Sequence, residues 1–406
     1  GLLPVEAAER LRHLPGLVFF DSALEIDGAR QISILAAAPS EVIEGDWNRD
    51  FNVLQTELRR RLTATQRDDG LPHGFAAGFV EYDGRFCFGV YERALFYRHR
   101  EGIWEEIGGL SAELREPRAP DQPPPLRFIS QMSADEYCAM VRRAQQYIAE
   151  GDIYQANLAH RFTAEWSGDP WPFYLALRDY SPAPYAAYLT LGGKTILSTS
   201  PESFLEMSGR LVRTRPIKGT RPRRADHHAD EKSAYDLLTS PKEIAELVMI
   251  TDLERSDLGQ VCETGSVAVR ELLKLERFEQ VFHLVSTVEG RLRADVDHAA
   301  ALRACFPGGS ITGAPKKRAR EIIAELEPIR RGLYTGTIGW FGFNGESQFN
   351  IAIRTVVVEP GRAHFHVGAG IVTDSIPEKE WQETLDKAAG ILTAADRLNE
   401  DVAKDE

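Results

Sequence analysis

The chain carries Phe306-Pro307-Gly308-Gly309-Ser310-Ile311-Thr312-Gly313-Ala314-Pro315-Lys316, a segment rich in glycine and proline that leads into a helical pattern. We expect this helix to begin at Pro315 and to end before Pro328. Backbone N–H groups exposed at a helix start can bind an anionic group. The segment is not a P-loop, because the GxxxxGK[ST] spacing is absent. Ordinary turns remain the alternative explanation for its glycines.

The composition is that of a globular protein with a sizeable core. Of the 406 residues 43% are hydrophobic, and 61 acidic against 48 basic side chains give a net charge of −13. This balance argues against a binder of duplex nucleic acid, which needs a basic face. The sequence contains neither an apolar run long enough to span a membrane nor the pattern of a signal peptide. We therefore expect a cytoplasmic enzyme with no nucleic-acid or membrane partner.

The cysteines give no sign of a metal or disulfide framework. They are spread along the chain, at Cys87, Cys138, Cys262 and Cys305, and none forms a CxxC pair. A zinc ribbon or a disulfide-rich fold would need closer or more regular spacing. We interpret them as buried thiols in a reducing compartment.

Short strand patterns dominate the first 115 residues, at 17–20, 32–36, 75–82, 85–90 and 94–97. Tyr82-Asp83-Gly84-Arg85 predicts a hairpin turn between two of these strands. Five prolines between residues 116 and 125 exclude a helix or a central strand there. We therefore divide the chain into a strand-rich region, 1–125, and a catalytic region, 126–400, and expect both to form one unit.

The second region mixes helices with strands. Ser133 and Glu136 form a capping box for a helix that stops at Gly151. Further helices are expected from Ser240 to about residue 253 and from near Pro377. Strand patterns occur at 187–191, 195–199, 203–207, 211–215, 335–343, 347–358 and 362–372. Strands in adjacent runs, with helices grouped between them, favour an α+β fold with antiparallel sheets.

Two of the expected helices carry carboxylate pairs. Glu243 and Glu246 are three residues apart, as are Glu380 and Glu383, so each pair shares one helix face, and Lys387 follows the second pair. Oxygen ligands of this kind suit Mg²⁺, which keeps several waters and often awaits an anionic substrate. Solvated helix faces are the alternative.

Two other segments could line a pocket. Lys218 lies between Ile217 and Gly219, directly after the strand 211–215, and a nucleophilic lysine must be uncharged, which requires desolvation or a cationic neighbour. Gly368-Ala369-Gly370 falls inside the strand 362–372, where glycine lets a ligand approach the backbone closely. For Lys218 alone the alternative is a surface position. We expect His364 and His366, on the same strand, to face solvent.

Several of these segments match one family in order and spacing: Ser200-Pro201-Glu202, Arg215-Pro216-Ile217-Lys218-Gly219-Thr220, Phe282-His283-Leu284-Val285-Ser286-Thr287, the segment 306–316 and Gly368-Ala369-Gly370-Ile371-Val372. They resemble the chorismate-utilising enzymes, which include anthranilate synthase, isochorismate synthase, salicylate synthase and aminodeoxychorismate synthase component I. The resemblance runs from about residue 130 to 395. It implies two layered antiparallel sheets with outer helices and an active site in a cleft.

Two positions discriminate within the family. The members that form aminodeoxychorismate have lysine at the position of Lys218, whereas anthranilate synthases typically have alanine there. Members that form isochorismate use a lysine base at the position of Gln155, and glutamine cannot act as that base. The resemblance therefore implies transfer of an amine rather than addition of water.

The resemblance also implies a metal and a substrate site. Mg²⁺ would be bound directly by Glu246 and Glu383 and through waters by Glu243 and Glu380. It would grip the ring carboxylate of chorismate. The remaining contacts to the substrate would come from Gln155, Ser310, Tyr334, Arg354, the Gly370 backbone and Lys387.

The implied chemistry uses three residues. Lys218 would attack C2 of chorismate and form a covalent intermediate. Glu202 would protonate the leaving hydroxyl at C4, with His283 hydrogen-bonded near it. Ammonia would then add at C4 and expel the lysine, which gives 4-amino-4-deoxychorismate for p-aminobenzoate and folate synthesis.

The resemblance implies partners as well. No cysteine stands in a Gly-x-Cys-x-Gly context, so ammonia would come from a separate glutamine amidotransferase subunit. Asp21 and Ser22 lie in a segment that resembles the tryptophan pocket of relatives, with Asp21 in place of glutamate, and whether tryptophan binds is left open. The alternatives are anthranilate synthase component I and a non-catalytic regulatory subunit that binds tryptophan.

Overall fold

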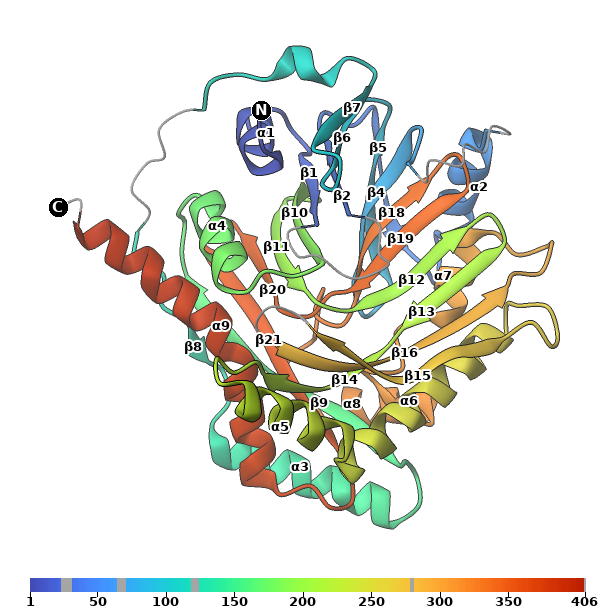
Figure 1. Ribbon diagram of the computed structural model, residues 1–406, viewed down its shortest axis with the longest axis vertical. Helices are drawn as coiled ribbons and strands as arrows, with labels where there is room; N and C mark the ends of the chain where they lie inside the picture. The colour runs from blue at the N-terminus through green and yellow to red at the C-terminus, as the bar shows by residue number, and fades with distance from the viewer. Residues whose placement is uncertain (23–30, 64–70, 118–123, 278–280, 405–406) are drawn as a thin grey trace.

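The two sheets of the molecule hold strands from both ends of the chain. The computed structural model describes residues 1–22, 31–63, 71–117, 124–277 and 281–404 (Figure 1). All strand pairs in the described residues are antiparallel. The expected α+β fold of two layered antiparallel sheets is therefore confirmed.

Sheet A runs, in spatial order, through β17 (Gly313–Ala314), β9 (Gln155–Glu165), β21 (Arg362–Ile371), β20 (Thr355–Glu359), β11 (Lys194–Ser200), β10 (Tyr185–Leu191), β1 (Val18–Asp21), β2 (Ile32–Ala36), β6 (Ala94–Arg98) and β7 (Ile103–Ile107), with β8 (Ile129–Ser130) beside β9. Sheet B runs through β14 (Ile217–Pro222), β16 (Val281–Arg291), β13 (Leu211–Arg215), β12 (Ser203–Ser208), β19 (Glu346–Ile351), β18 (Thr337–Gly342), β4 (Phe75–Val80), β5 (Arg85–Tyr91) and β3 (Glu41–Asp46), with β15 (Ala268–Arg277) beside β16. Because β1 pairs with β10 and β4 pairs with β18, the regions on either side of residue 125 share both sheets.

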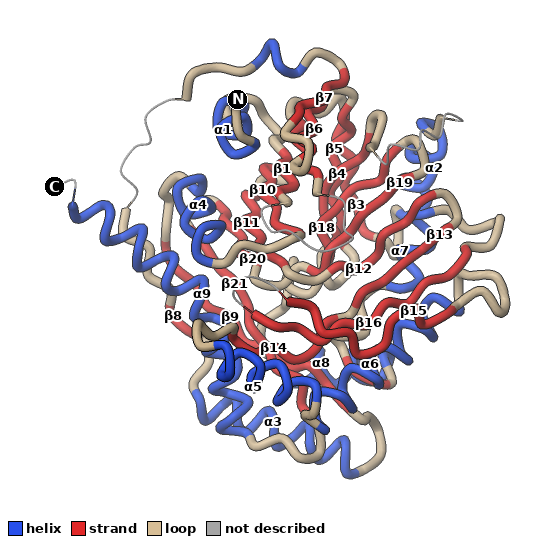
Figure 2. The backbone as a smooth tube through the Cα atoms, viewed as in Figure 1, coloured by secondary structure: helices blue, strands red, loops and turns tan. Residues whose placement is uncertain are grey.

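Helices cover the outer faces of both sheets (Figure 2). The helices are α1 (Pro4–Leu11), α2 (Phe51–Arg61), α3 (Ala134–Ala149), α4 (Pro170–Tyr180), α5 (His227–Leu238), α6 (Pro241–Gly259), α7 (His298–Cys305), α8 (Lys316–Leu326) and α9 (Pro377–Lys404), with a short 3₁₀ turn η1 (Leu110–Glu113). One apolar cluster joins sheet A to α1, α4 and α9, and a second joins sheet B to α2 and α7. A third fills the space between the sheets, with Phe75 and Ile338 of sheet B facing Ile196 of sheet A.

The expected strand 347–358 is two strands, and this prediction was wrong. β19 belongs to sheet B and β20 to sheet A, so the chain crosses between the sheets after Ile351. Arg354 adopts φ +48° at the crossing, in the left-handed region that residues other than glycine rarely enter. Apolar residues stand on both sides of the break, at 351–353 and 356–358, so the sequence pattern did not reveal it.

Several local predictions are confirmed. The Ser133 side chain accepts from the Glu136 N–H, which caps α3 as expected. Residues 81–84 connect β4 to β5, and Gly84 takes φ +98°. Ser240 caps α6 and Pro241 opens it, although the helix continues to Gly259, beyond the expected end.

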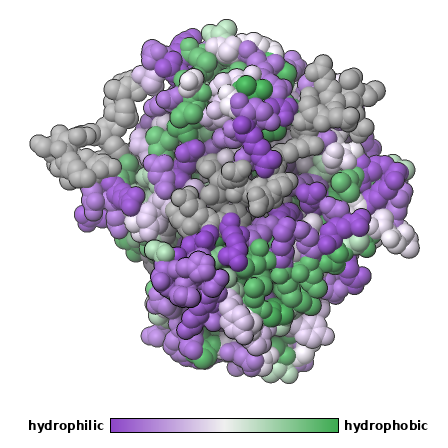
Figure 3. All heavy atoms as spheres, viewed as in Figure 1, coloured by the Kyte–Doolittle hydropathy of each residue, from purple (hydrophilic) through white to green (hydrophobic). Residues whose placement is uncertain are grey.

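The face shown in Figure 3 is mainly hydrophilic, as the net charge leads one to expect. An apolar area lies below its centre, over β15 and β16. Val269 and Leu272 of β15 are 39% and 53% exposed, so they contribute apolar surface to this sheet edge.

The position of α9 on sheet A depends on an aromatic layer beneath it. The rings of Phe162 on β9 and Phe365 on β21 stack with centroids 5.0 Å apart, and Phe128 meets Phe365 edge-on at 4.9 Å. Phe365 is 1% exposed and belongs to the cluster that includes Ala388 and Ile391 of α9. Whatever α9 carries is therefore positioned through these rings.

We predict that Phe365→Ala lowers the free energy of unfolding by about 3–5 kcal/mol, because it leaves a cavity in a packed aromatic cluster. Urea denaturation monitored by circular dichroism measures this loss. Phe365→Leu, which keeps most of the volume, is the control and should lose less. An alanine variant as stable as the leucine variant would contradict the packing described here.

Candidate active site

A cavity of about 630 Å³ is lined by residues of both sheets and of α6 and α9. Most residues that the sequence predicted for the site line it, namely Glu202, Lys218, Glu243, Glu246, His283, Ser310, Tyr334, Arg354, Gly370, Glu383 and Lys387. Gln155 and Glu380 are not among the lining residues. Gln155 lies against Gly370 and Glu380 lies 3.7 Å from Nζ of Lys242, and both Gly370 and Lys242 line the cavity. Asp21 and Ser22 lie elsewhere, on β1 and just after it.

A bulge in β14 aims Lys218 at α6. The pairing of β14 with β16 shifts register between Lys218 and Thr220, and the intervening Gly219 takes φ +72°. A bulge with glycine in the left-handed conformation redirects neighbouring side chains. The Nζ atom of Lys218 lies 3.4 Å from Oε2 of Glu246, and the Lys218 side chain is 18% exposed. The Pro-Ile-Lys-Gly-Thr turn thus presents an amine to the cavity.

Glu202 is a buried carboxyl group on the turn between β11 and β12. Its Oε1 accepts a hydrogen bond of 2.8 Å from the Ser310 hydroxyl. Burial raises the pKa of Glu202 to about 7, although the Ser310 hydrogen bond and the positive charge of Lys218 oppose the rise. A carboxyl group with such a pKa can hold a proton near neutral pH and donate it.

His283 and Arg354 form another part of the wall. The Nδ1 atom of His283, on β16, lies 3.0 Å from the Thr220 hydroxyl. Burial, together with the positive charge of Arg354, lowers the pKa of His283 to about 4, so the ring is neutral at pH 7. Burial also lowers the pKa of Arg354, and no ion pair within 4.0 Å joins its guanidinium to a carboxylate of the described residues. Such a guanidinium can bind a carboxylate ligand through two hydrogen bonds.

Gly368 and Gly370 of β21 expose the strand backbone to the cavity near Lys218. A Cβ atom on Gly370 would lie 2.4 Å from Nε2 of Gln155 and 3.6 Å from Nζ of Lys218. A Cβ atom on Gly368 would lie 2.9 Å from the Tyr334 hydroxyl. Only glycine therefore lets these polar groups approach the strand so closely.

The carboxylates of α6 and α9 differ in their surroundings. Burial raises the pKa of Glu380, although a hydrogen bond of 2.7 Å from the Ser375 hydroxyl opposes the rise. Burial also acts to raise the pKa of Glu383, but Lys387, Lys218 and Lys242 outweigh it and leave this pKa lowered. Lys387 donates at 2.8 Å to Glu383 and at 2.9 Å to the carbonyl of Gly368.

The chemistry of these carboxylates suits a hard divalent cation. Glu243, Glu246, Glu380 and Glu383 offer only carboxylate oxygens, and Oε2 of Glu380 is buried with no hydrogen-bond partner. Their spacing is wider than that of a closed site. Among the described residues, three ligand atoms lie within 4.8 Å of one another only at the exposed His227, His228 and Glu231.

Sequence reasoning missed several residues of the cavity. Lys242, Asn157, Arg221 and His366 line it, and Thr220 both lines it and contacts His283. The available signals were weak: Thr220 ends the Pro-Ile-Lys-Gly-Thr motif, and Lys242 stands directly before the carboxylate pair of α6.

The expectation that His364 and His366 face solvent was wrong. They are 9% and 4% exposed, because β21 lies inside sheet A and Val357, the partner of His364 on β20, packs in the cluster between the sheets. Burial lowers the pKa of His364 to about 4 and that of His366 well below its ordinary value. The His366 ring stacks on Tyr334 with centroids 5.4 Å apart, so it supports a residue of the cavity wall.

Asp21 is engaged by other side chains. The Arg178 Nε donates to its carboxylate at 2.5 Å, and the Tyr174 hydroxyl lies at 3.5 Å. The Ser22 hydroxyl donates to the Ile32 carbonyl at 3.0 Å. Ala23, the next residue of the segment that resembles a tryptophan pocket, lies outside the described residues.

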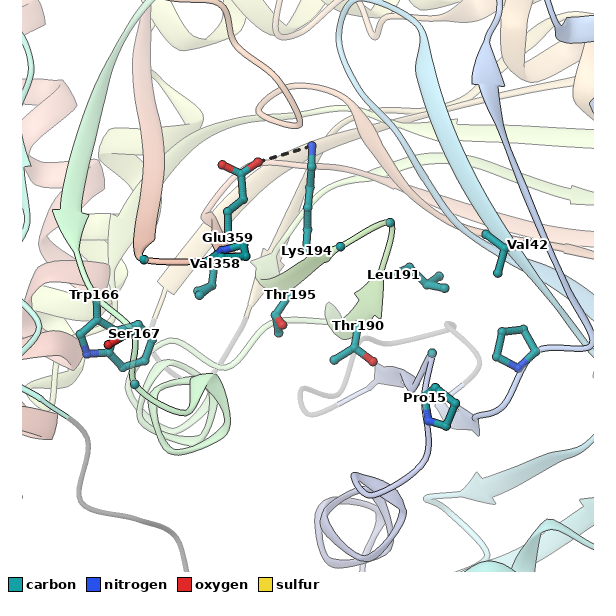
Figure 4. A pocket seen from close by; sticks show the side chains of 17 residues that line it. Pro15, Val42, Trp166, Ser167, Thr190, Leu191, Lys194, Thr195, Val358 and Glu359 are labelled. Atoms are coloured by element: carbon teal, nitrogen blue, oxygen red, sulfur yellow. Dashed lines mark ion pairs between the residues drawn. The ribbon is translucent and has the colours of Figure 1, made fainter.

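A second cleft, of about 850 Å³, lies around the turn between β10 and β11. Figure 4 shows Lys194 extending toward Glu359, with 3.8 Å between the charged atoms. Trp166, Pro15 and Val42 stand apart from this pair on the wall. None of the site residues predicted from the sequence lines this cleft.

The helices of the described residues include none with the length and apolar character needed to cross a membrane.

The chain is similar to known proteins over most of its length. A model of the chorismate binding enzyme family matches residues 23–393. The chain is 45% identical over 274 residues to aminodeoxychorismate synthase component 1 of Bacillus subtilis, covering 68% of this chain and 58% of that protein. It is 40% identical over 391 residues to the Salmonella typhimurium protein of the same name, covering 90% and 86%. It is also 46% identical over 297 residues to an anthranilate synthase component 1 of Haloarcula marismortui, covering 73% and 58%.

The matched part of this chain thus spans between half and two thirds of the Bacillus and Haloarcula proteins. Among solved structures, anthranilate synthase component I of Streptococcus pneumoniae superposes with a TM-score of 0.79 at 33% identity, covering 91% of this chain and 93% of that one. The menaquinone-specific isochorismate synthase of Escherichia coli shares the fold, with a TM-score of 0.78 at 18% identity, covering 96% and 91%. The chain belongs to the family of chorismate-binding enzymes.

Proposed function

We propose that this chain converts chorismate and ammonia to 4-amino-4-deoxychorismate, a step toward p-aminobenzoate and folate. The observation that carries the proposal is Lys218, whose amine lies in the cavity 3.4 Å from Glu246. Relatives 45% and 40% identical are named aminodeoxychorismate synthase component 1, and this name supports the same reaction. We further propose a cytoplasmic location and a glutamine amidotransferase subunit as the source of ammonia.

Chorismate carries two carboxylates, and the cavity offers two kinds of partner for them. Arg354 has a guanidinium that pairs with no described carboxylate, and Tyr334 lies near Gly368 on the same wall, so together they would hold the enolpyruvyl carboxylate. The ring carboxylate would face α6 and α9. A Mg²⁺ ion held there by Glu246 and Glu383, with Glu243 and Glu380 through waters, would offset the repulsion between the carboxylates and the substrate.

The proposed reaction consists of two displacements that balance without an oxidant or reductant. After its ammonium group has released a proton to solvent, the Lys218 amine forms a bond to C2, both ring double bonds shift, and the C4–O bond breaks. Glu202 donates its proton to the departing hydroxyl, which leaves as water. Ammonia then forms a bond to C4, both double bonds shift back, and the bond between C2 and Lys218 breaks, while the new ammonium group returns a proton to Glu202. The ring has exchanged a hydroxyl group for an amino group, and lysine is regenerated.

Anthranilate synthesis is the second candidate. A relative 46% identical and a solved structure 33% identical carry that name. Both reactions begin with attack at C2 and loss of the C4 hydroxyl, so Glu202 and the carboxylates would serve either one. A purely regulatory, tryptophan-binding subunit is less well supported, because its cavity would not need Glu202 and Lys218 beside the four carboxylates.

Product analysis tests the proposed function. The purified chain, with chorismate, ammonium and Mg²⁺, should form 4-amino-4-deoxychorismate, detected as p-aminobenzoate after addition of a lyase. Lys218→Ala should reduce this product at least about 100-fold and leave anthranilate as the remaining product, because only the direct route to C2 is then open. Lys232→Ala, on the exposed face of α5, is the matched control. Anthranilate as the main product of the unchanged chain, or normal output from Lys218→Ala, would contradict the proposal.

The pKa of Glu202 predicts the pH dependence. A general acid must be protonated, so Glu202 with its pKa of about 7 should contribute to kcat/KM a factor that is constant below pH 7 and falls tenfold per pH unit above it, where the group loses its proton. Glu202→Gln should reduce kcat about 10²–10⁴-fold and abolish this alkaline limb. Initial rates measured from pH 5.5 to 9 provide the test. An alkaline limb of the same pKa in the variant would exclude Glu202 as its source.

A further inference from the structure

We infer that Lys242 is a built-in counter-ion of the carboxylate cluster, which occupies this cluster in the metal-free enzyme and must move aside when a divalent cation binds. This inference rests on the proposed metal site of α6 and α9. It concerns how tightly that site binds its cation, and it gives a role to a residue for which the resemblance implies none.

The contacts of Lys242 span the two helices. Lys242 is the second residue of α6, and its Nζ lies 3.9 Å from Oε1 of Glu246, one helical turn further on. The same atom lies 3.7 Å from Oε1 of Glu380 on α9. The charge of Lys242 also interacts with Glu243 and Glu383, so one ammonium group acts on all four proposed metal ligands.

The side chain of Lys242 is more exposed than those of its partners. The side chains of Glu246 and Glu380 are 11% and 4% exposed, whereas that of Lys242 is 54% exposed. A lysine of this kind can withdraw its ammonium group into solvent by rotation of its flexible side chain. The carboxylates cannot do the same, because they are fixed on packed helices and Glu380 accepts from Ser375.

The charge balance favours such a withdrawal. The four carboxylates carry four negative charges, and three lysines lie among them: Lys242, Lys218 at 3.4 Å from Glu246, and Lys387 at 2.8 Å from Glu383. The cluster is therefore close to neutral with all three in place, and a divalent cation would make it positive. Removal of the most exposed ammonium group restores the balance at the least cost.

The spacing of the carboxylates agrees with this account. No three of the four proposed ligands bring their oxygens within 4.8 Å of one another in the described residues. The buried Oε2 of Glu380 has no hydrogen-bond partner, although the neighbouring Oε1 faces Lys242. An ammonium group between the helices makes distant contacts with several carboxylates, whereas a metal ion needs short ones. The cluster in this form suits the lysine better than the ion.

Binding of Mg²⁺ to the substrate-free chain, measured by isothermal titration calorimetry, tests the inference. Lys242→Met keeps the length of the side chain and removes its charge, and it should lower the Kd for Mg²⁺ about fivefold. It should also lower the melting temperature in EDTA, since the carboxylates then repel one another, and Mg²⁺ should restore it. Lys242→Arg retains the charge and should keep the Kd within about twofold of the unchanged chain. Lys379→Met is the matched control, because Lys379 is exposed beside Glu380 and makes no ion pair with a described residue.

The outcomes separate this inference from the proposed function. If Glu246→Gln leaves the Kd for Mg²⁺ unchanged, the proposed metal site itself is wrong. If Glu246→Gln weakens binding but Lys242→Met binds Mg²⁺ no more tightly than Lys379→Met, the metal site stands and the counter-ion role of Lys242 is overturned. Tighter binding and metal-restored stability in Lys242→Met alone would support it.

Discussion

The site depends on the opposition of one amine and one carboxylate inside a cavity, Lys218 on a bulged strand and Glu246 on a capped helix. Neither group could stay in place without support from its own element. Gly219 provides the left-handed residue that turns Lys218 out of the β14 ladder, and Ser240 fixes the start of α6. On the far wall, Gly370 leaves the space that a side chain would take from Lys218 and Gln155. The chemistry of the site is thus built on two glycines and a helix cap.

The two layered sheets explain why these elements meet. β14 and β16 end sheet B, β21 lies within sheet A, and α6 and α9 lie outside both sheets (Figure 1). The chain crosses from one sheet to the other at Arg354, which leaves a guanidinium in the cavity. The four carboxylates lie on α6 and α9, whereas the Arg354 guanidinium lies where the chain passes between the sheets. The cavity thus offers two unlike environments for a carboxylate, and this difference can orient a substrate that carries two carboxylates.

Much of the fold could be predicted from local signals, because those signals act over a few residues. The capping box at Ser133 and the hairpin turn at Gly84 are of this kind. β9 and β16 were missed, since each places buried polar residues such as His160 and His283 where a strand pattern would have apolar ones. The break at Arg354 was missed for another reason: apolar residues flank Arg354 on both sides, and its rare backbone conformation leaves no mark in the sequence.

The candidate site divides in the same way. Residues inside glycine- and proline-rich motifs, such as Lys218 and Ser310, could be found because the motifs themselves were recognisable. Lys242 could not, since a lysine in the first turn of a helix has the pattern of a solvated side chain. Its contact with Glu380 joins residues 138 positions apart and exists only in the folded chain. His366 was placed in solvent because the sequence does not show that Tyr334 stacks on its ring.

The proposed reaction requires a bond between the Lys218 amine and the ring of chorismate, and mass spectrometry of the protein and its peptides can detect this bond. The chain is mixed with chorismate and Mg²⁺ without ammonium, quenched with acid within its first turnovers, and digested. We expect a gain equal to the mass of chorismate less one water, located on the peptide that contains Lys218. Quenched enzyme that consumes chorismate with no such gain, or that carries it on another peptide, would contradict the account.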